Sequence, residues 1–450
     1  MTAPLFTPRQ RIFLWLACSA IFFEAFDVSI VNLALPVMAT DLHIPLPSTQ
    51  WIQTLYLLSF GSFLLLGGRL CDHYGSRTIF IAGMLLFGLT SLAAALSHHL
   101  VILLLARSGQ GIGAALSMPG GISLLSRHFK EGEQRQHAFG IFGAFAAIGF
   151  AGGLALGGLI TVWLNWHWIF GINVPVIGGV LVAAAFYIPE EQNHQPSSIN
   201  VLTAIWLTLT LLVFCYGVHE ASSLGWWLFP FLIIASISGI LLLRYDLRRS
   251  APFFQPGIYS SSMAYRGMAV SSLLGASFLS FVFICTLILE EVFHWDTRST
   301  GLLLFPYSIG SALVSSYLLP QLFRKMKVIR VGQLAMACLL AGALLLAAAL
   351  YTHQLIFLLL ALFLVNSVCI AMAYPAFTIL SLTGVATRNL GMASGLQSAI
   401  YSIGSGIGLS ILGLCLQSFS RYSMDIRLLS TCGIIAGLCA TALLILRKAV

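Results

Sequence analysis

Long apolar runs alternate with short polar gaps along the whole chain. A helix rises about 1.5 Å per residue, so a run of about twenty apolar residues crosses the roughly 30 Å hydrocarbon layer of a bilayer. The pattern predicts an all-α integral membrane protein with fourteen transmembrane helices. They lie near residues 12–36, 50–71, 78–97, 100–126, 137–160, 167–188, 201–219, 226–243, 264–289, 299–320, 329–351, 355–378, 391–416 and 428–446.

The first of these runs carries two carboxylic acids in its middle, Glu24 and Asp27. A charge at that depth costs about 2.5–3.5 kcal/mol, and is tolerated where it faces a bundle interior, a water-filled cavity or a partner charge. Because the two acids are three residues apart, they share one helix face, and their mutual repulsion favours proton capture by one of them. The two readings are a functional proton site and a structural polar residue satisfied by hydrogen bonds.

Arg107 is the only basic residue well inside an apolar run. It either extends outward to the membrane surface or pairs with an acid of the first run. Counted inward from the outer ends near Pro36 and Leu100, Asp27 and Arg107 lie at depths of roughly 14 and 11 Å. We therefore expect Arg107 to contact Asp27 in at least one state, with Glu24 one turn deeper and also in reach.

Basic residues are distributed unevenly between the polar gaps. With the N-terminus in the cytoplasm, all but four of the 22 Lys and Arg residues fall in cytoplasmic segments, the four being Arg107, Arg298, Arg421 and Arg427. This asymmetry predicts an orientation with both termini cytoplasmic. We expect a multi-pass protein of the plasma (inner) membrane whose first run is an uncleaved span rather than a signal peptide.

Composition narrows the functional classes. Charged residues make up 8% of the chain, against about 25% in soluble domains. The net charge of +8 is spread over many short gaps, so we expect no nucleic-acid partner. The nine cysteines are scattered without a CxxC pair, which predicts neither a metal site nor a disulfide framework. We find no nucleophile–base pair and no soluble domain that could hold an ATPase, so we expect no enzyme.

Two halves of the chain resemble each other. A cytoplasmic arginine followed by a glycine-rich span occurs at 135–158 and again at 388–413. Duplicated six-helix halves are typical of transporters that rock about a site at the membrane midplane. We predict an N-terminal bundle at 1–190, two extra helices at 191–250, and a C-terminal bundle at 251–450 that begins with a cytoplasmic connector.

The loop between the second and third runs carries a specific signature, GRLCDHYGSR, from Gly68 to Arg77. Gly68 and Gly75 allow close backbone approach, and Asp72 suits either a helix N-terminus or a pair with Arg77. The spacing G-x-L-x-D-x-x-G-x-R resembles the signature loop of the major facilitator superfamily. That resemblance implies a conformational latch at these four residues.

Further segments extend the resemblance over nearly the whole chain. The segments at 26–36 (FDVSIVNLALP) and 48–60 (STQWIQTLYLLSF) and the two extra central helices look like the fourteen-helix drug:proton antiporter branch, of the multidrug-efflux type. The fifth run resembles the antiporter motif, with Leu154 where that motif has proline. Small residues in membranes let helices pack closely. We assign packing roles to Gly109, Gly113, Gly149, Gly153 and Gly157.

The resemblance implies a proton-coupled secondary transporter, and we expect it to export an amphipathic compound from the cytoplasm. Asp27 is the first choice for the proton-coupling acid and Glu24 the second, with Arg107 acting on them. Trp51, Tyr56, Gln110 and Tyr307 are candidates for a substrate pocket. We expect no cofactor, the proton gradient as energy source, and a monomer in the lipid bilayer. The alternatives are export of one metabolite or siderophore, or proton-coupled uptake; the sequence does not name the substrate.

Overall fold

The structure is a computed structural model that describes residues 6–44, 46–129, 132–188, 201–219, 228–248, 261–295, 297–418 and 424–447. The described residues form helices joined by short turns, with no β-strand among them. A helix lies within each of the fourteen predicted ranges. Nine helices in the described part are long and apolar enough to cross a membrane, so the count of fourteen crossings stays a prediction.

The described residues of the first half of the chain form seven helices. They are α1 (Pro8–Asp41), α2 (Leu46–Tyr74), α3 (Ser76–Ala95), α4 (Leu100–His128), α5 (Glu133–Trp163), α6 (His167–Gly171) and α7 (Asn173–Tyr187). The described residues of the central region form α8 (Val201–His219) and α10 (Leu228–Leu247).

The second half begins with α11 (Ser262–Leu287), which continues into a π-helical turn at Ile288–Val292. The next span joins α12 (Thr297–Leu313), a π-helical turn at Val314–Leu318 and α13 (Leu319–Lys325). After α14 (Val328–Thr352), a second composite span joins α15 (Leu355–Leu362), a π-helical stretch at Phe363–Cys369 and α16 (Ile370–Leu382). The chain ends with α17 (Leu390–Ser418) and α18 (Met424–Arg447).

The first helix and the first turn show why the chain folds this way locally. Thr7 and Gln10 form a capping box at the start of α1, and Pro8 stands in the first turn, where its missing N–H costs nothing. Gly75 joins α2 to α3 with φ of +89°, a conformation that favours glycine. That single residue reverses the chain in the predicted latch loop.

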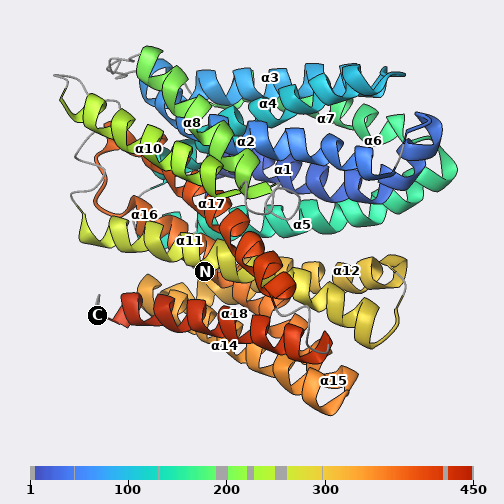
Figure 1. The fold of residues 1–450 in the computed structure, drawn as a ribbon. Coiled ribbons are helices and arrows are strands. Elements are labelled where there is room, and N and C mark those ends of the chain that lie inside the picture. The colour runs from blue at the N-terminus through green and yellow to red at the C-terminus, as the bar shows by residue number, and fades with distance from the viewer. Residues whose placement is uncertain are drawn as a thin grey trace.

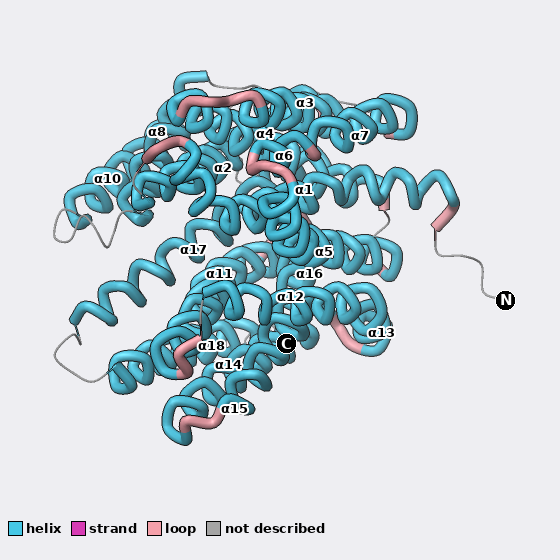
Figure 2. Tube along the Cα trace, turned by 90° about the vertical axis from the view of Figure 1, so that its right-hand side faces the viewer, coloured by secondary structure: helices cyan, strands magenta, loops and turns pink. Residues whose placement is uncertain are grey.

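The helices form two groups. In Figure 1 the helices of the first half lie in the upper part and those of the second half below, with α17 running between them; Figure 2 shows the same groups after a quarter turn. The two central helices pack on each other through Ser238 of α10, which bonds Trp206 and Thr210 of α8. The predicted domain boundaries lie among residues 189–200 and 249–260, outside the described residues, and stay predictions.

The two ends of the helix bundle differ in how the halves meet. We call the end where α1 begins and α18 ends the proximal end, and the opposite end the distal end. The largest buried apolar cluster of the first half includes Leu390, Met392 and Leu396 from the proximal part of α17. A separate cluster at the distal end, around Ile30, Ile52 and Phe170, draws its buried residues from the first half alone. Among the described residues, the buried apolar cluster that joins α17 to the first half therefore lies towards the proximal end.

Candidate functional site

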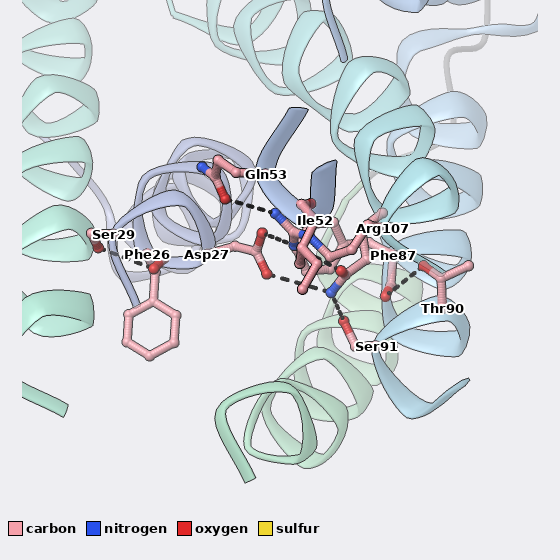
Figure 3. A network of polar contacts seen from close by, with 10 residues as sticks. Phe26, Asp27, Ser29, Ile52, Gln53, Phe87, Thr90, Ser91 and Arg107 are labelled. Carbon is pink, nitrogen blue, oxygen red and sulfur yellow. Dashed lines mark hydrogen bonds and ion pairs between the residues drawn. The ribbon is translucent and has the colours of Figure 1, made fainter. Parts of the chain in front are cut away.

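A buried ion pair joins α1 to α4 in the first bundle. Arg107 and Asp27 are both 0% exposed, and Nη1 of Arg107 donates to Oδ2 of Asp27. Figure 3 shows the two side chains pointing towards each other from their separate helices. The contact expected from the matched depths of these residues is thus present in this conformation. Its role in proton coupling stays a prediction.

Neutral groups of the same bundle complete the surroundings of Arg107. The guanidinium donates through Nε to the carbonyl oxygen of Ile52 at 3.0 Å, through Nη2 to Oε1 of Gln53 at 3.2 Å, and through Nη1 to Oε1 of Gln110 at 2.8 Å. With the bond to Asp27, four of the five donors that a guanidinium carries have an acceptor. One carboxylate and three neutral oxygens therefore compensate the free-energy cost of removing this cation from water.

Gln110 links Asp27 to a third helix. Its amide nitrogen donates to Oγ of Ser91 on α3 at 2.8 Å, and lies 3.4 Å from Oδ1 of Asp27. Arg107 and Gln110 are three residues apart on one face of α4, which lets both reach the same carboxylate. Gln110 was a candidate for the substrate pocket; in this conformation it is fully buried in the ion-pair network.

Tyr56 lies against the same cation. Its ring centroid is 4.4 Å from Cζ of Arg107, and the side chain is 0% exposed. The face of an aromatic ring attracts a cation, so Tyr56 adds to the binding of Arg107. Tyr56 too was a predicted pocket residue, and here it forms the wall of the ion-pair site.

Glu24 has different surroundings from Asp27. It is only partly buried, and it forms no hydrogen bond or ion pair with another described residue. Glu24 is thus the partly exposed acid of α1, while Asp27 is enclosed within the first bundle.

The other predicted pocket residues lie elsewhere. Trp51, 37% exposed, stacks on Tyr216 of α8, on the side of the first bundle covered by the central helices. Tyr307 of α12 donates to the carbonyl oxygen of Leu359 at 3.3 Å, within the second bundle. The structure does not bring these two together with Tyr56, and their role in a pocket stays a prediction.

The latch loop holds the two bundles together at the proximal end. The carboxylate of Asp72, near the end of α2, accepts backbone N–H bonds from Gly391 at 2.8 Å and Met392 at 2.7 Å in the first turn of α17. Unpaired N–H groups and the positive end of the helix dipole make such a turn a site for an anion. Asp72 therefore bonds a helix N-terminus, which was the first of the two expected arrangements.

The ion pair of Asp72 is formed with Arg127 of α4, whose Nη2 lies 3.3 Å from Oδ1. Arg77, the partner considered from the sequence, donates to the carbonyl oxygen of Ala185 in α7 at 2.9 Å. Glycines bring the helices close enough for these bonds. A methyl carbon added at Gly68 would lie 2.4 Å from the carbonyl oxygen of Gly391, so the two backbones touch without side chains between them.

A second contact between the bundles at the proximal end is exposed. Glu133, at the start of α5, forms an ion pair with Arg324 of α13, and both side chains are more than half exposed. Together with Asp72, this pair joins the first bundle to the second at the end where α1 begins and α18 ends.

The glycines assigned to helix packing lie at close crossings. On α4, added methyl carbons would meet Thr90 at Gly109 and the backbone of Phe87 at Gly113, both on α3. On α5, Gly149, Gly153 and Gly157 would meet backbone atoms of Phe22, Phe26 and Ile30, all on α1. In the described residues no group of three His, Cys, Asp or Glu side chains could hold a metal ion.

The sequence interpretation missed several residues of these sites. Gln53 and Ser91 are polar residues inside apolar runs, which was a signal that could have marked them. The carbonyl of Ile52 and the amides of Gly391 and Met392 carry no such signal, because any residue type has these groups.

Comparisons with known proteins agree with this architecture. The chain is 32% identical over 315 residues to the cephamycin export protein of Amycolatopsis lactamdurans. The aligned region covers 69% of this chain and 65% of that protein. The chain is 28% identical over 402 residues to the multidrug resistance protein Stp of Mycobacterium tuberculosis, covering 89% of this chain and 74% of Stp. The human organic anion transporter MFSD10 has a similar fold, with a TM-score of 0.71 at 14% identity, over 98% of this chain and all of that one.

The match to a known family extends over most of the sequence. Residues 17–409 match the Major Facilitator Superfamily. The chain therefore belongs to this superfamily of multi-pass membrane transporters of small molecules.

Proposed function

We propose that the protein is a proton-coupled antiporter that exports amphipathic, drug-like compounds from the cytoplasm. The observation that carries the proposal is the buried pair of Asp27 and Arg107 inside a transporter fold. Ionisable groups buried in membrane helices are costly and mark proton and substrate pathways. The names of the relatives, a cephamycin exporter and a multidrug resistance protein, support export of antibiotic-like compounds.

The surroundings of Arg107 make Asp27 a suitable proton site. Removing one partner of a buried ion pair ordinarily costs about 3–5 kcal/mol, because the other charge is left without compensation. Here Arg107 keeps the oxygens of Ile52, Gln53 and Gln110 when Asp27 is neutral. Asp27 can therefore gain and lose a proton while the cation stays in place.

The bonds of Asp72 support a transport cycle in which the bundles rock about this site. They close the proximal end in the present conformation and have to break when that end opens. We place the proximal end at the cytoplasm of a plasma (inner) membrane, on the distribution of Lys and Arg. The present conformation would then release substrate to the outside and take up protons there. We propose that the transporter acts as a monomer, needs no bound cofactor, and is driven by the proton gradient.

Labelling of single cysteines tests the orientation. Cysteines placed at the exposed positions His43 and His99 of the distal end should react with a membrane-impermeant maleimide in intact cells. A cysteine at the exposed Glu133 of the proximal end should react only after permeabilisation. Ser97, near His99 in sequence, is only 1% exposed and is a poor position for this test. Reaction at Glu133 in intact cells would contradict the orientation.

Transport by purified protein in liposomes tests the proposed activity. A panel of ethidium, antibiotics and metabolites should include compounds that move saturably against their gradient when a pH gradient is imposed. The movement should stop when the pH gradient is collapsed with an ionophore. Flux that does not respond to the pH gradient for any compound would contradict proton coupling.

A second candidate is export of one specific metabolite. The relative matched at 32% identity is named for cephamycin alone, which favours a narrow substrate range. The same panel separates the two candidates, because a multidrug exporter moves several unrelated compounds while a specific exporter moves one chemical class. Proton-coupled uptake would show the opposite direction of movement under the same gradient.

A further inference from the structure

The proposed proton site has no direct access to water. Asp27 is 0% exposed, and its carboxylate lies against Arg107 and Gln110. Neither neighbour can deliver a proton, since a guanidinium stays charged in proteins and an amide does not titrate. If Asp27 exchanges protons during transport, the proton must reach it through another group.

Glu24 is an acid close to Asp27 that is partly exposed. It lies three residues before Asp27 on the same face of α1. A proton arriving from water would therefore meet Glu24 before Asp27. A gap of one helical turn between the two carboxyl groups remains to be bridged.

Tyr56 of α2 lies beside the ion pair of Asp27 and Arg107. Its ring packs 4.4 Å from the guanidinium that binds Asp27, so the phenol lies next to the ion pair. Glu24 lies one turn from Asp27 on the same face of α1. The hydroxyl group of Tyr56 is buried and has no hydrogen-bond partner among the described residues. A buried hydroxyl without a partner is unusual in proteins, and suggests a partner that is present in another state.

We propose that the Tyr56 hydroxyl relays protons between Glu24 and Asp27. In the transfer, the protonated Glu24 gives its proton to the phenol oxygen while the phenol O–H gives its own proton to the Asp27 carboxylate. One O–H bond breaks and one forms at Tyr56, which is neutral before and after, and the net result is one proton moved from Glu24 to Asp27. The relay rests on the proposed function, because it assumes that Asp27 is the proton site.

The contact with Arg107 fixes the ring of Tyr56. The cation lies over the face of the ring, so the hydroxyl at the ring edge takes no part in this contact. Phenylalanine at this position would keep the ring and its contact with the cation and would lose only the hydroxyl. Tyr56→Phe is therefore the variant that tests the relay without removing the wall of the site.

A pH jump on the purified protein tests the relay without knowledge of the substrate. The protein in detergent is moved from alkaline to acid pH, and proton uptake is followed with a fluorescent pH indicator. Tyr56→Phe should take up as many protons as the unaltered protein but about tenfold or more slowly, within the range expected for loss of a positioned proton donor. Tyr317→Phe, which removes the hydroxyl of a tyrosine that is 69% exposed, is the matched control and should take up protons at the normal rate.

A double substitution distinguishes a relay from two independent effects. Glu24→Gln should slow the uptake assigned to Asp27 by a similar factor, because it removes the group that feeds Tyr56. Glu24→Gln combined with Tyr56→Phe should be no slower than the slower single variant, because groups that act in series are not additive. Should Tyr56→Phe fail to fold, Glu24→Gln carries the same prediction alone.

Asp27→Asn separates failure of the relay from failure of the proposed function. It should lose the uptake assigned to Asp27 altogether. If it does, and Tyr56→Phe and Glu24→Gln keep the normal rate, the relay is wrong and the proton site stands. If Asp27→Asn takes up protons as the unaltered protein does, the proton site is wrong and the relay falls with it.

Discussion

Two buried carboxylates of this protein differ in whether their bonds stay within one bundle or join the two bundles. Among the described residues, Asp27 bonds only groups of the first bundle, Arg107 and Gln110 on α4. Asp72 also pairs with α4, through Arg127, but its two short bonds go to the first turn of α17 in the second bundle. The first acid can change its charge without moving the bundles apart. The second cannot keep its bonds if they separate.

In the proposed transport cycle, this difference gives the two sites separate roles. Asp27 and Arg107 would change their total charge within the first bundle. The bonds of Asp72 would stabilise the one conformation in which the two bundles meet at the proximal end. Substitutions at the first site should change coupling to protons, and substitutions at the second should change the balance between conformations.

The largest effect is expected at Arg107. Arg107→Ala leaves the Asp27 carboxylate buried without its cation, which costs about 3–5 kcal/mol in comparable pairs. Arg107→Lys keeps the charge and should be milder, although a lysine cannot reproduce the four bonds of the guanidinium. Thermal unfolding in detergent and transport in liposomes measure both effects.

The matched rescue is the double variant Arg107→Ala with Asp27→Asn, which removes the isolated acid. It should recover much of the lost stability without recovering proton-driven transport. Equal stability of the single and double variants would mean that the two side chains do not depend on each other.

The next largest effect is expected where the bundles touch through glycine. In Gly68→Ala, the new methyl carbon would lie 2.4 Å from the carbonyl oxygen of Gly391, so α2 and α17 must move apart and the bonds of Asp72 must lengthen. We expect severe loss of transport and increased labelling of cysteines at the proximal end. Gly437→Ala is the control, because a methyl carbon there meets nothing within 4 Å.

Asp72→Asn should have a smaller effect than Gly68→Ala. The amide oxygen can still accept one N–H bond from α17, but the variant loses the negative charge at the helix terminus and the ion pair with Arg127. Transport should fall while expression stays near normal, and coupling to protons in the remaining flux should be unchanged. Unchanged turnover would reduce this loop to a simple turn.

The smallest effect is expected at Glu133 and Arg324. Both side chains are more than half exposed, and exposed ion pairs contribute about 0–1 kcal/mol. Glu133→Gln should change transport slightly, and less still at high salt because salt screens exposed charges. A loss as large as that of Asp72→Asn would show that the exposed pair, rather than Asp72, dominates the contact.

The sequence predicted those features that follow from residue type and spacing along the chain. Apolar runs predicted the helices, and residue counts along two helices placed Asp27 and Arg107 at one level, where the structure brings them together. The bonds of Asp72 could not be predicted in the same way. Gly391 lies 319 residues further along the chain, and its contribution is a backbone amide that any residue would have. The choice of Arg127 over Arg77 likewise depends on how α4 packs beside α2.

The pocket residues show a second limit. Trp51, Tyr56 and Tyr307 were grouped because aromatic rings can line a pocket for flat or cationic ligands. The structure places Tyr56 under Arg107, Trp51 against α8 and Tyr307 within the second bundle. The residue type alone does not tell which side of a helix a ring occupies, since a membrane helix can be apolar on every face.

The central claim is that Asp27 carries the proton that drives export, and Asp27→Asn tests it most directly. The variant and the unaltered protein are placed in liposomes, and transport of a compound found with the panel is measured with and without a pH gradient, beside its equilibrium binding. Because asparagine keeps the size and the buried position of the side chain, binding should remain within a few-fold of normal. The account predicts that the pH gradient no longer drives transport by Asp27→Asn. Full proton-driven transport by this variant would contradict the account and assign the proton to Glu24.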